Sequence, residues 1–337
     1  MAVFAELLQL SSSIIFAALL VISLMTLNLL RTKNVKYPPI IKGWIPWLGC
    51  AIEFGKAPLT FIKESSEKHG EVFTFYAIGQ RMTFLTDVRD FHLFFNSPQA
   101  DFQRAVEDAV KNTAGINRVD FFTNHRRIHD LVKGRLSSSN LSKLTPKVGR
   151  KLEEYAASGK FSTELCDATR SCLAGSLAKL SLEEVKKLRK VEHCILEAIR
   201  LRPAGMIARK LTGPMQVREF TIPAGDMLMI SPYWAHQNEA IYPDARSYVP
   251  ERWNQTVGSD KSAPSDKFFA FGGGRFQCPG RRFAMMEIQM FISLLLCSFD
   301  LELVKEEVPL PSPRHVVGVP HPLSPCYVKM HKRVRTV

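Results

Sequence analysis

The chain has 337 residues, of which 46% are hydrophobic, so it can bury a sizeable core and is not disordered by composition. Its 45 Lys and Arg against 32 Asp and Glu give a formal net charge of +13, but no nucleic-acid-binding motif accompanies the short basic clusters. We therefore expect no nucleic-acid partner. The positive charge could instead serve an anionic membrane surface or an acidic protein partner. Seven cysteines without regular spacing favour a reducing compartment over a disulfide-stapled secreted fold.

The N-terminal segment from Leu7 to Leu30 is almost uncharged and mostly apolar. Its denser part, Ile14 to Leu30, approaches the length of about 20 residues that a bilayer requires. Glu6 precedes this segment and Arg31 follows it, so the positive-inside rule places the rest of the chain in the cytosol. The alternative is a cleaved signal peptide, which normally carries its positive charge before a shorter apolar core. The pattern favours a transmembrane anchor.

A connection rich in proline and glycine follows at 37–49, and it excludes a continuous helix. Residues 60–69 then show a helical pattern. Two stretches, 72–78 and 81–86, carry the β-branched and aromatic residues of strands around a turn at Gly79-Gln80. The sequence therefore predicts one helix followed by a β-hairpin.

The clearest later helix is predicted from about 182 to 201, because apolar residues recur there every three or four positions. Ser181 and Glu184 form a capping box at its start, and Pro203 follows its end. A second strong helix is predicted after Pro279-Gly280, and it is apolar enough to be deeply buried.

A glycine-rich loop at 268–280 has the sequence FFAFGGGRFQCPG. Its three consecutive glycines allow a positive φ angle and a close approach to a flat cofactor. They place Cys278 just before a helix, where the helix dipole and nearby amides favour the thiolate that a metal needs. A glycine-rich turn with an incidental buried cysteine is the alternative.

Glu197 and Arg200 stand three residues apart on one face of the predicted helix. Taken alone, such a pair is usually an exposed contact that contributes little. Arg252, in the sequence Pro-Glu-Arg-Trp at 250–253, could complete a buried network in which planar guanidinium groups bind the carboxylate through two hydrogen bonds.

These motifs occur in an order, Glu-x-x-Arg, Pro-Glu-Arg-Trp and Phe-x-x-Gly-x-x-x-Cys-Pro-Gly, that strongly resembles the cytochrome P450 family. The resemblance implies a mainly α fold with small β-sheets. It also implies that Cys278 is the fifth ligand of the iron of haem b (iron protoporphyrin IX). Glu197, Arg200 and Arg252 would form a structural lock beneath the haem.

The resemblance implies further cofactor-binding residues. Phe271, Gly274 and Gly280 match positions of the loop motif, and Arg209 matches the position that members use to pair a haem propionate. The alternative for Arg209 is an ordinary surface arginine. Phe276 departs from the pattern, because many members carry an arginine or histidine there. That departure is frequent in the sterol-handling branch, which includes the cholesterol and oxysterol 7α-hydroxylases.

Similarity to that branch implies a haem-dependent monooxygenase that inserts one oxygen atom of O2 into a sterol or oxysterol C–H bond in cholesterol and bile acid metabolism. Electrons would come from NADPH through a separate NADPH–cytochrome P450 reductase, at the endoplasmic reticulum membrane. The stretches 105–116, 204–208 and 316–319 are expected to contact the substrate by resemblance alone.

The central region of the family, including the helix on the distal face of the haem, has no counterpart between Cys172 and Ser181. We expect a membrane anchor at 1–30 and an internally truncated haem-thiolate domain at 31–337. A catalytically inactive haem-binding or interaction isoform is the alternative function.

Three histidines could suggest a metal site, namely His236 and the pair His125 and His129. No third partner follows at the spacing of metal ligands, so we interpret all three as structural.

Overall fold

A computed structural model describes residues 19–21, 23, 35–157, 179–202, 205–256, 267–307, 309–310 and 322–333. The predicted anchor lies almost entirely outside these ranges, as do the expected junction after Cys172 and the stretch 316–319. Within the described ranges, none of the helices combines the length and the apolar character needed to cross a bilayer.

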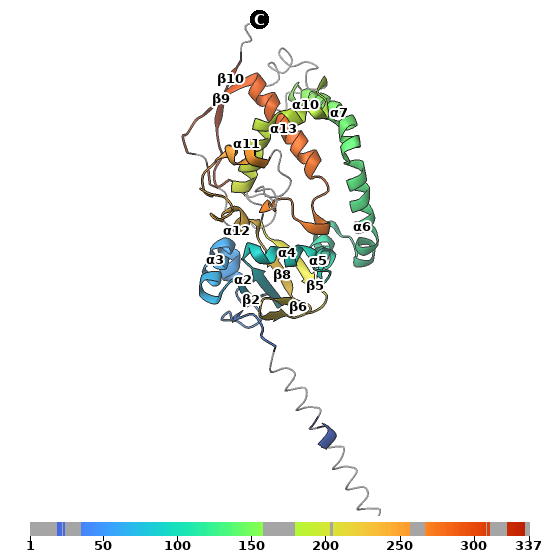
Figure 1. Cartoon of the computed structure of the whole chain (residues 1–337), viewed down its shortest axis with the longest axis vertical. Coiled ribbons are helices and arrows are strands. Elements are labelled where there is room, and N and C mark those ends of the chain that lie inside the picture. Colours follow the sequence, from blue (N-terminus) through green and yellow to red (C-terminus); the bar gives the residue numbers. More distant parts are fainter. Residues whose placement is uncertain are drawn as a thin grey trace, which may run out of the picture.

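The fold is mainly helical with small β-sheets, as expected (Figure 1). Its helices are α2 (Ala51–Lys56), α3 (Pro58–His69), α4 (Phe91–Asn96), α5 (Phe102–Ala114), α6 (Arg118–Arg135), α7 (Ser138–Ala157), α10 (Leu182–Lys187), α11 (Arg189–Leu201), α12 (Pro232–His236) and α13 (Arg281–Ser298). Its strands are β1 (Ile40–Ile41), β2 (Val72–Ala77), β3 (Gln80–Leu85), β4 (Ala100–Asp101), β5 (Ile207–Leu211), β6 (Met215–Val217), β7 (Phe220–Ile222), β8 (Met227–Ile230), β9 (Phe299–Leu303) and β10 (Val328–Lys332). Short 3-10 helices occupy Val88–Asp90, Pro250–Thr256 and Gly274–Phe276.

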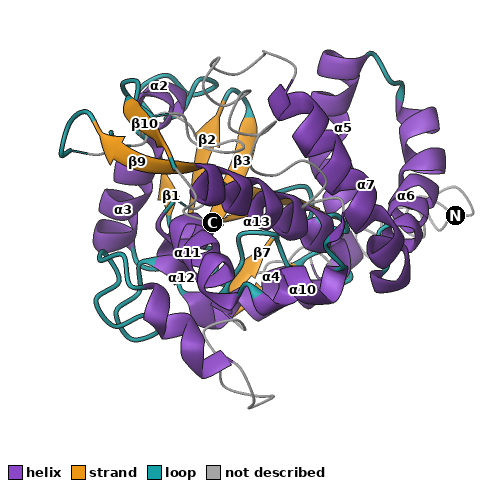
Figure 2. Ribbon diagram, turned by 90° about the horizontal axis from the view of Figure 1, so that it is seen from above, coloured by secondary structure: helices purple, strands orange, loops and turns teal. Residues whose placement is uncertain are grey.

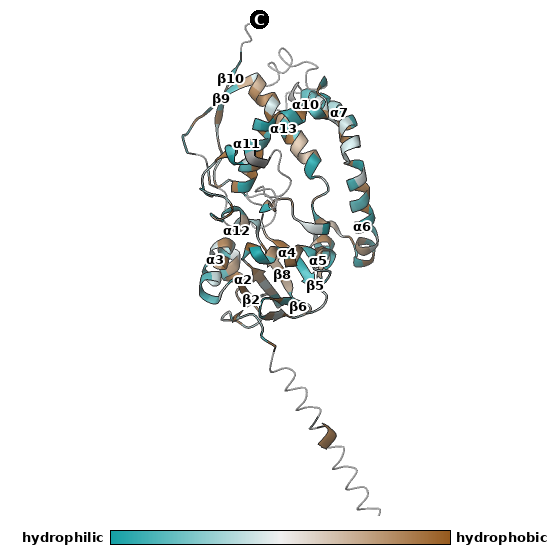
Figure 3. Cartoon of the chain, in the orientation of Figure 1, coloured by the Kyte–Doolittle hydropathy of each residue, from teal (hydrophilic) through white to brown (hydrophobic). Residues whose placement is uncertain are grey.

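Six strands form the main sheet in the order β1-β2-β3-β8-β5-β4, and two antiparallel pairs, β6-β7 and β9-β10, stand apart from it. Seen from above, the strands β1, β2 and β3 lie on one side of the molecule and the helices α5, α6 and α7 on the other, with α13 between them (Figure 2). The strand β2 is hydrophobic, whereas α7 carries many hydrophilic residues (Figure 3). The main sheet is therefore part of the core, and the outer helices face solvent.

The predicted β-hairpin is present as β2 and β3, but its turn lies one residue earlier than expected. Ala77 pairs with Gln80, so the two central residues are Ile78 and Gly79. Both have positive φ angles, 51° and 72°. The buried strand residues Thr74 and Thr83 join the two strands through a hydrogen bond of 2.7 Å between their hydroxyl groups.

The helix predicted over 182–201 is two helices, and that prediction was wrong at Leu188. There the backbone leaves the helical region (φ −76°, ψ 51°), and α10 ends before α11 begins. Leu182 and Val185 pack with Met286 of α13, whereas α11 buries Glu197 and Arg200 against other elements. Both helices contact α13, while α10 also contacts α7 and α11 also contacts the 3-10 helix Pro250–Thr256. The predicted capping box at the start of α10 is confirmed.

The helix α13 follows Pro279-Gly280 as predicted, but it is not buried on all sides. Met286, Met290 and Leu294 are buried. Ile288 and Leu296 are 37% and 43% exposed. Apolar composition alone therefore overstated the burial of this helix, because its described neighbours cover one face.

Candidate functional site

Cys278 is exposed and lies two residues before Gly280, the N-cap of α13. Its backbone N–H donates to the carbonyl of Phe271 at 2.9 Å, and the N–H of Gly272 donates to the carbonyl of Phe269 at 2.9 Å. These bonds fold the loop into a tight turn that presents the thiol at the start of the helix. Cys278 is therefore not a buried cysteine, and its thiol is accessible.

Two glycines of the loop are required by a close approach to α4. Gly274 has φ 60°, and a Cβ atom there would lie 2.5 Å from the carbonyl oxygen of Phe95. A Cβ atom on Gly273 would lie 3.0 Å from the ring of Phe95. That ring also stacks on Phe269, with 5.2 Å between the ring centroids. The loop is thereby held against α4 on one side.

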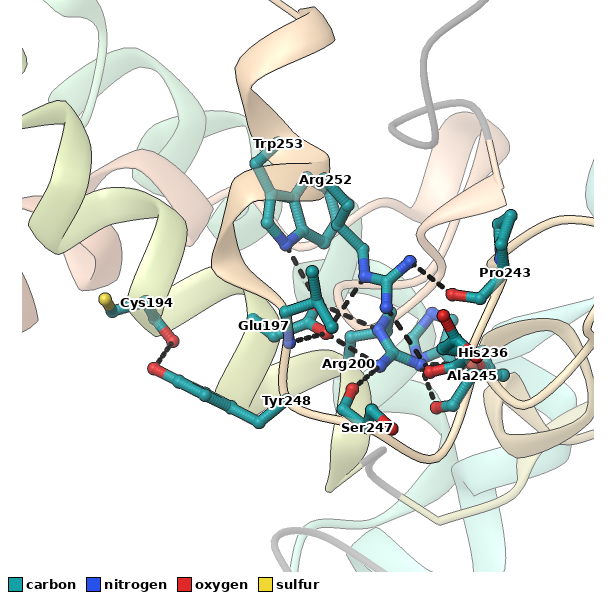
Figure 4. A network of polar contacts seen from close by, with 12 residues as sticks. Cys194, Glu197, Arg200, His236, Pro243, Ala245, Ser247, Tyr248, Arg252 and Trp253 are labelled. Carbon is teal, nitrogen blue, oxygen red and sulfur yellow. Dashed lines mark hydrogen bonds and ion pairs between the residues drawn. The ribbon is translucent and has the colours of Figure 1, made fainter.

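Glu197 is fully buried and is the centre of a polar network (Figure 4). Arg200 donates to both of its oxygens, from Nη2 at 2.8 Å and from Nε at 2.9 Å. Arg252 Nε, Trp253 Nε1 and the N–H of Val249 each donate to the same carboxylate at 3.0 Å. Burial alone would raise the pKa of Glu197, but these donors outweigh it and hold the pKa below its usual value.

Arg200 is also fully buried, and its remaining donors are used. Its Nη1 donates to the carbonyls of His236 at 2.6 Å and Ala245 at 2.7 Å, and its Nη2 donates to the carbonyl of Ser247 at 3.1 Å. The guanidinium also lies over the ring of Tyr242 at 5.1 Å. The structure thus brings Glu197, Arg200 and Arg252 together in the interior, and the alternative of an exposed pair is wrong.

His236 connects this network to the cysteine loop. Its carbonyl accepts from Arg200, while its Nε2 accepts from the N–H of Phe269 at 3.0 Å. Its ring stacks on Phe268 at 5.1 Å. Burial, followed by the nearby charge of Arg200, lowers the pKa of His236 to about 3, so the ring is neutral and Nε2 is free to accept. Sequence reasoning recognised a structural histidine but missed this link, for which the sequence offered no signal.

Arg209 lies on β5 and is only 2% exposed, so the alternative of a surface arginine is wrong. Its guanidinium carbon lies 4.9 to 5.1 Å from the ring centroids of Phe94, Phe102 and Phe276. Among the described residues, no carboxylate forms an ion pair with it, and burial lowers the pKa of Arg209 to about 10. A buried cation that forms no ion pair with a described carboxylate suits an anionic group of a ligand.

Residues 163–330 match the family model described as cytochrome P450. The chain belongs to the cytochrome P450 family. It is similar to the 24-hydroxycholesterol 7-alpha-hydroxylase of Mus musculus, with 29% identity over 90% of this chain and 95% of the relative. The Homo sapiens protein of the same name is 27% identical over 91% of this chain and 96% of the relative. By family, the chain is a monooxygenase related to the oxysterol 7α-hydroxylases.

A solved structure supports the P450 fold. The chain aligns with the retinoic acid bound cyanobacterial CYP120A1 at a TM-score of 0.66 and 17% identity. The alignment covers 89% of this chain and 100% of the cyanobacterial one. At that identity the likeness concerns the fold alone.

Family membership implies a haem, and the pocket beside Cys278 fits one. The pocket has a volume of about 340 Å³ and is lined by His129, Lys133, Leu136, Ser137, Gly274, Arg275, Gln277, Cys278, Pro279, Arg281 and Arg282. Its cationic residues suit the two carboxylates of haem. His129 contributes a buried Nε2 atom that has no hydrogen-bond partner in the described part of the chain. A thiol ligand and a positive lining are the features that a thiolate-bound haem requires.

Of the other predicted cofactor-binding residues in the loop, Gly280 lies beside the thiol of Cys278 and Phe271 does not line this pocket. Gly280 adjoins the thiol, because a Cβ atom there would lie 3.9 Å from Cys278 Sγ. Phe271 instead lines a separate cavity of about 540 Å³ together with Trp253. His125 bonds to Gln103 at 2.9 Å, and the described residues hold no cluster of metal-ligating side chains.

Proposed function

We propose that this chain is a haem-thiolate protein of the sterol-hydroxylating class that binds haem b through Cys278. The observation that carries the proposal is the chain of contacts from the buried Glu197 through Arg200 and His236 to the cysteine loop. Such a network fixes the backbone around an exposed thiol at a helix start. Haem with a thiolate ligand supplies the activation of O2 for insertion into a C–H bond.

The residues of the chain have distinct roles in this proposal. Cys278 ligates the iron, and Arg209 pairs with a propionate. Glu197, Arg200 and Arg252 hold the fold beneath the haem, while Gly274 lets the loop approach α4 and Gly280 leaves the thiol uncovered. Phe271, also of the loop, lines the neighbouring cavity.

The substrate proposed for the family activity is an oxysterol such as 24-hydroxycholesterol, hydroxylated at the 7α position in cholesterol and bile acid metabolism. The names of the relatives support it. The redox partner would be NADPH–cytochrome P450 reductase, and the net charge of +13 suits an acidic partner.

A second function is favoured by one observation, the length of the alignment with the relatives. It spans 447 positions, but 90% of this chain is only about 303 residues, so about 144 positions have no residue of this chain opposite them. That number supports an internal truncation, which we propose to lie between Cys172 and Ser181 and to remove the distal side. Without that enclosure, water would reach the iron and the sterol would not be held near it. We therefore propose that the 337-residue form binds haem but does not hydroxylate sterols.

The test compares the 337-residue protein with a version in which the central region is restored, each supplied with reductase, NADPH and 24-hydroxycholesterol. We expect haem in both proteins and 7α-hydroxylated product from the restored chain alone. Comparable product from both would refute the inactive isoform, and absence of haem from both would refute the haem-thiolate proposal.

The proposed location is the endoplasmic reticulum membrane, with one span at 14–30 and the body in the cytosol. The charge asymmetry around that segment supports it. Protease added to sealed microsomes should digest a C-terminal tag, whereas full protection of the tag would reverse the topology.

A further inference from the structure

A cavity of about 540 Å³ lies among the helices α7, α10, α11 and α13, and we call it the α13 cavity. The helix α13 contacts each of the other three, and all four lie in the half of the molecule away from β2 (Figure 1). The volume falls within the range of about 300 to 1,000 Å³ that is usual for small-molecule sites. The α13 cavity is therefore large enough to hold a ligand.

The lining of the α13 cavity is largely apolar. One face of α13 contributes to it, because the lining positions recur at the spacing of a single helical face, namely Arg281, Arg282, Met285, Met286 and Gln289. The other helices add apolar side chains, among them Leu141, Leu182 and Leu196. Phe271, from the cysteine loop, also lines the cavity. The body of an occupant would therefore meet mostly hydrocarbon surface.

The charges in the lining are mainly positive. Three cations, Lys186, Arg281 and Arg282, stand against one carboxylate, that of Glu192. Lys186 and Arg282 are exposed residues, so the positive charge reaches the opening of the cavity. Ammonium and guanidinium groups at the mouth of an apolar cavity favour a ligand with an anionic group at one end.

Gln289 brings a hydrogen-bond donor to the same cavity. Its side chain is only 5% exposed, and its Nε2 atom is buried without a hydrogen-bond partner in the described part of the chain. Leaving such a donor unpaired costs free energy, and few buried polar groups in proteins are left so. Gln289 follows Arg281 by eight residues, which places it about 12 Å further along the axis of α13. The cationic end and the unpaired donor are thus separated by the length of a small chain molecule.

We propose that the α13 cavity binds an amphipathic anion with an oxygen acceptor at its apolar end. The anionic group meets Lys186 and Arg281, and the apolar chain lies between the helices. The terminal oxygen accepts from Gln289 once its amide turns toward the cavity, a rotation about a broad torsion. An ω-hydroxy fatty acid is the simplest molecule with all three features.

This cavity is separate from the pocket beside Cys278, although Arg281 and Arg282 line both. The inference goes beyond the proposed function and does not require turnover or a haem. Binding measured on the protein therefore tests it independently of the haem-thiolate proposal.

The test titrates the purified 337-residue protein with ω-hydroxydodecanoate and with dodecanoate in a calorimeter, each below its micelle-forming concentration. We expect one site per chain and about 2- to 10-fold tighter binding of the hydroxy acid, the gain from one buried hydrogen bond. Gln289→Leu keeps an apolar side chain of similar size and should abolish that difference while the affinity for dodecanoate is retained. An undiminished preference for the hydroxy acid in Gln289→Leu would overturn the proposal.

Two further variants locate the ligand. Lys186→Gln should weaken both acids by up to about 5-fold, whereas Lys187→Gln is the matched control, because Lys187 is the next exposed lysine and does not line the cavity. Met285→Trp fills the cavity and should abolish binding while circular dichroism and Tm report a folded protein. Unchanged binding in folded Met285→Trp would place the acids elsewhere on the chain and overturn the proposal, as would the absence of saturable binding in the wild-type protein. If Met285→Trp does not fold, the comparison of Lys186→Gln with Lys187→Gln decides, and equal affinities in those two variants would overturn the proposal.

Discussion

Replacing Glu197 by alanine tests whether the buried network holds the fold. The change leaves Arg200, whose side chain is fully buried, and Arg252, whose side chain is 9% exposed, without their carboxylate. Trp253 Nε1 and the N–H of Val249 lose their acceptor as well. Breaking a buried charge pair by removing one partner costs about 3 to 5 kcal/mol, so we expect a loss of that size in the free energy of unfolding.

The chain offers a control with the same spacing. Glu183 pairs with Lys186 three residues later at 2.6 Å, but its side chain is 72% exposed. An exposed pair of this kind contributes only about 0.2 to 0.5 kcal/mol. Denaturant unfolding followed by circular dichroism, with haem content measured in parallel, compares Glu197→Ala with Glu183→Ala. Equal losses of stability in the two variants would refute the reasoning.

Two further predictions concern the supports of the cysteine loop. Gly274→Ala should destabilise the protein and lower its haem content, because the new Cβ would meet the backbone of Phe95 and Gly274 has a positive φ angle. Gly213→Ala is the control and should be tolerated, because its Cβ would meet only the flexible side chain of Gln99. Equal haem content in the two variants would contradict this prediction. His236→Leu removes the acceptor of the Phe269 N–H and should lower haem content more than His236→Gln, which keeps an acceptor. Folding lowers the pKa of His236, so between pH 6.5 and about 3 the unfolded protein binds a proton at this histidine that the folded protein does not bind. The free energy of unfolding of the wild-type protein should therefore fall as the pH drops through that range. An equal fall in the His236→Gln variant would show that another group is responsible.

Local signals in the sequence predicted the local structure well. The capping box of Ser181 and Glu184 and the hairpin around Gly79 depend on residues within a few positions of each other, and both are present. The break at Leu188 was missed, because the apolar spacing of Val185, Leu188 and Val191 continues through it.

In the candidate site, too, some features could be predicted from the sequence and others only from the structure. The motif identified Cys278, Glu197, Arg200 and Arg252, but only the structure shows that the pair on α11 is buried. The role of His236 depends on a contact with Phe269, 33 positions further along the chain, and no short-range pattern encodes it. Burial and long-range contacts decide these points, so composition and spacing could not.

The central claim is that Cys278 binds the haem iron, and the spectrum of the reduced carbon monoxide complex tests it most directly. The purified 337-residue protein should give the red-shifted band typical of a thiolate ligand. Cys278→Ser should abolish that band, whereas Cys326→Ser, which changes another exposed thiol, should retain it. A wild-type spectrum from Cys278→Ser, or no thiolate band from the unmodified protein, would contradict the claim.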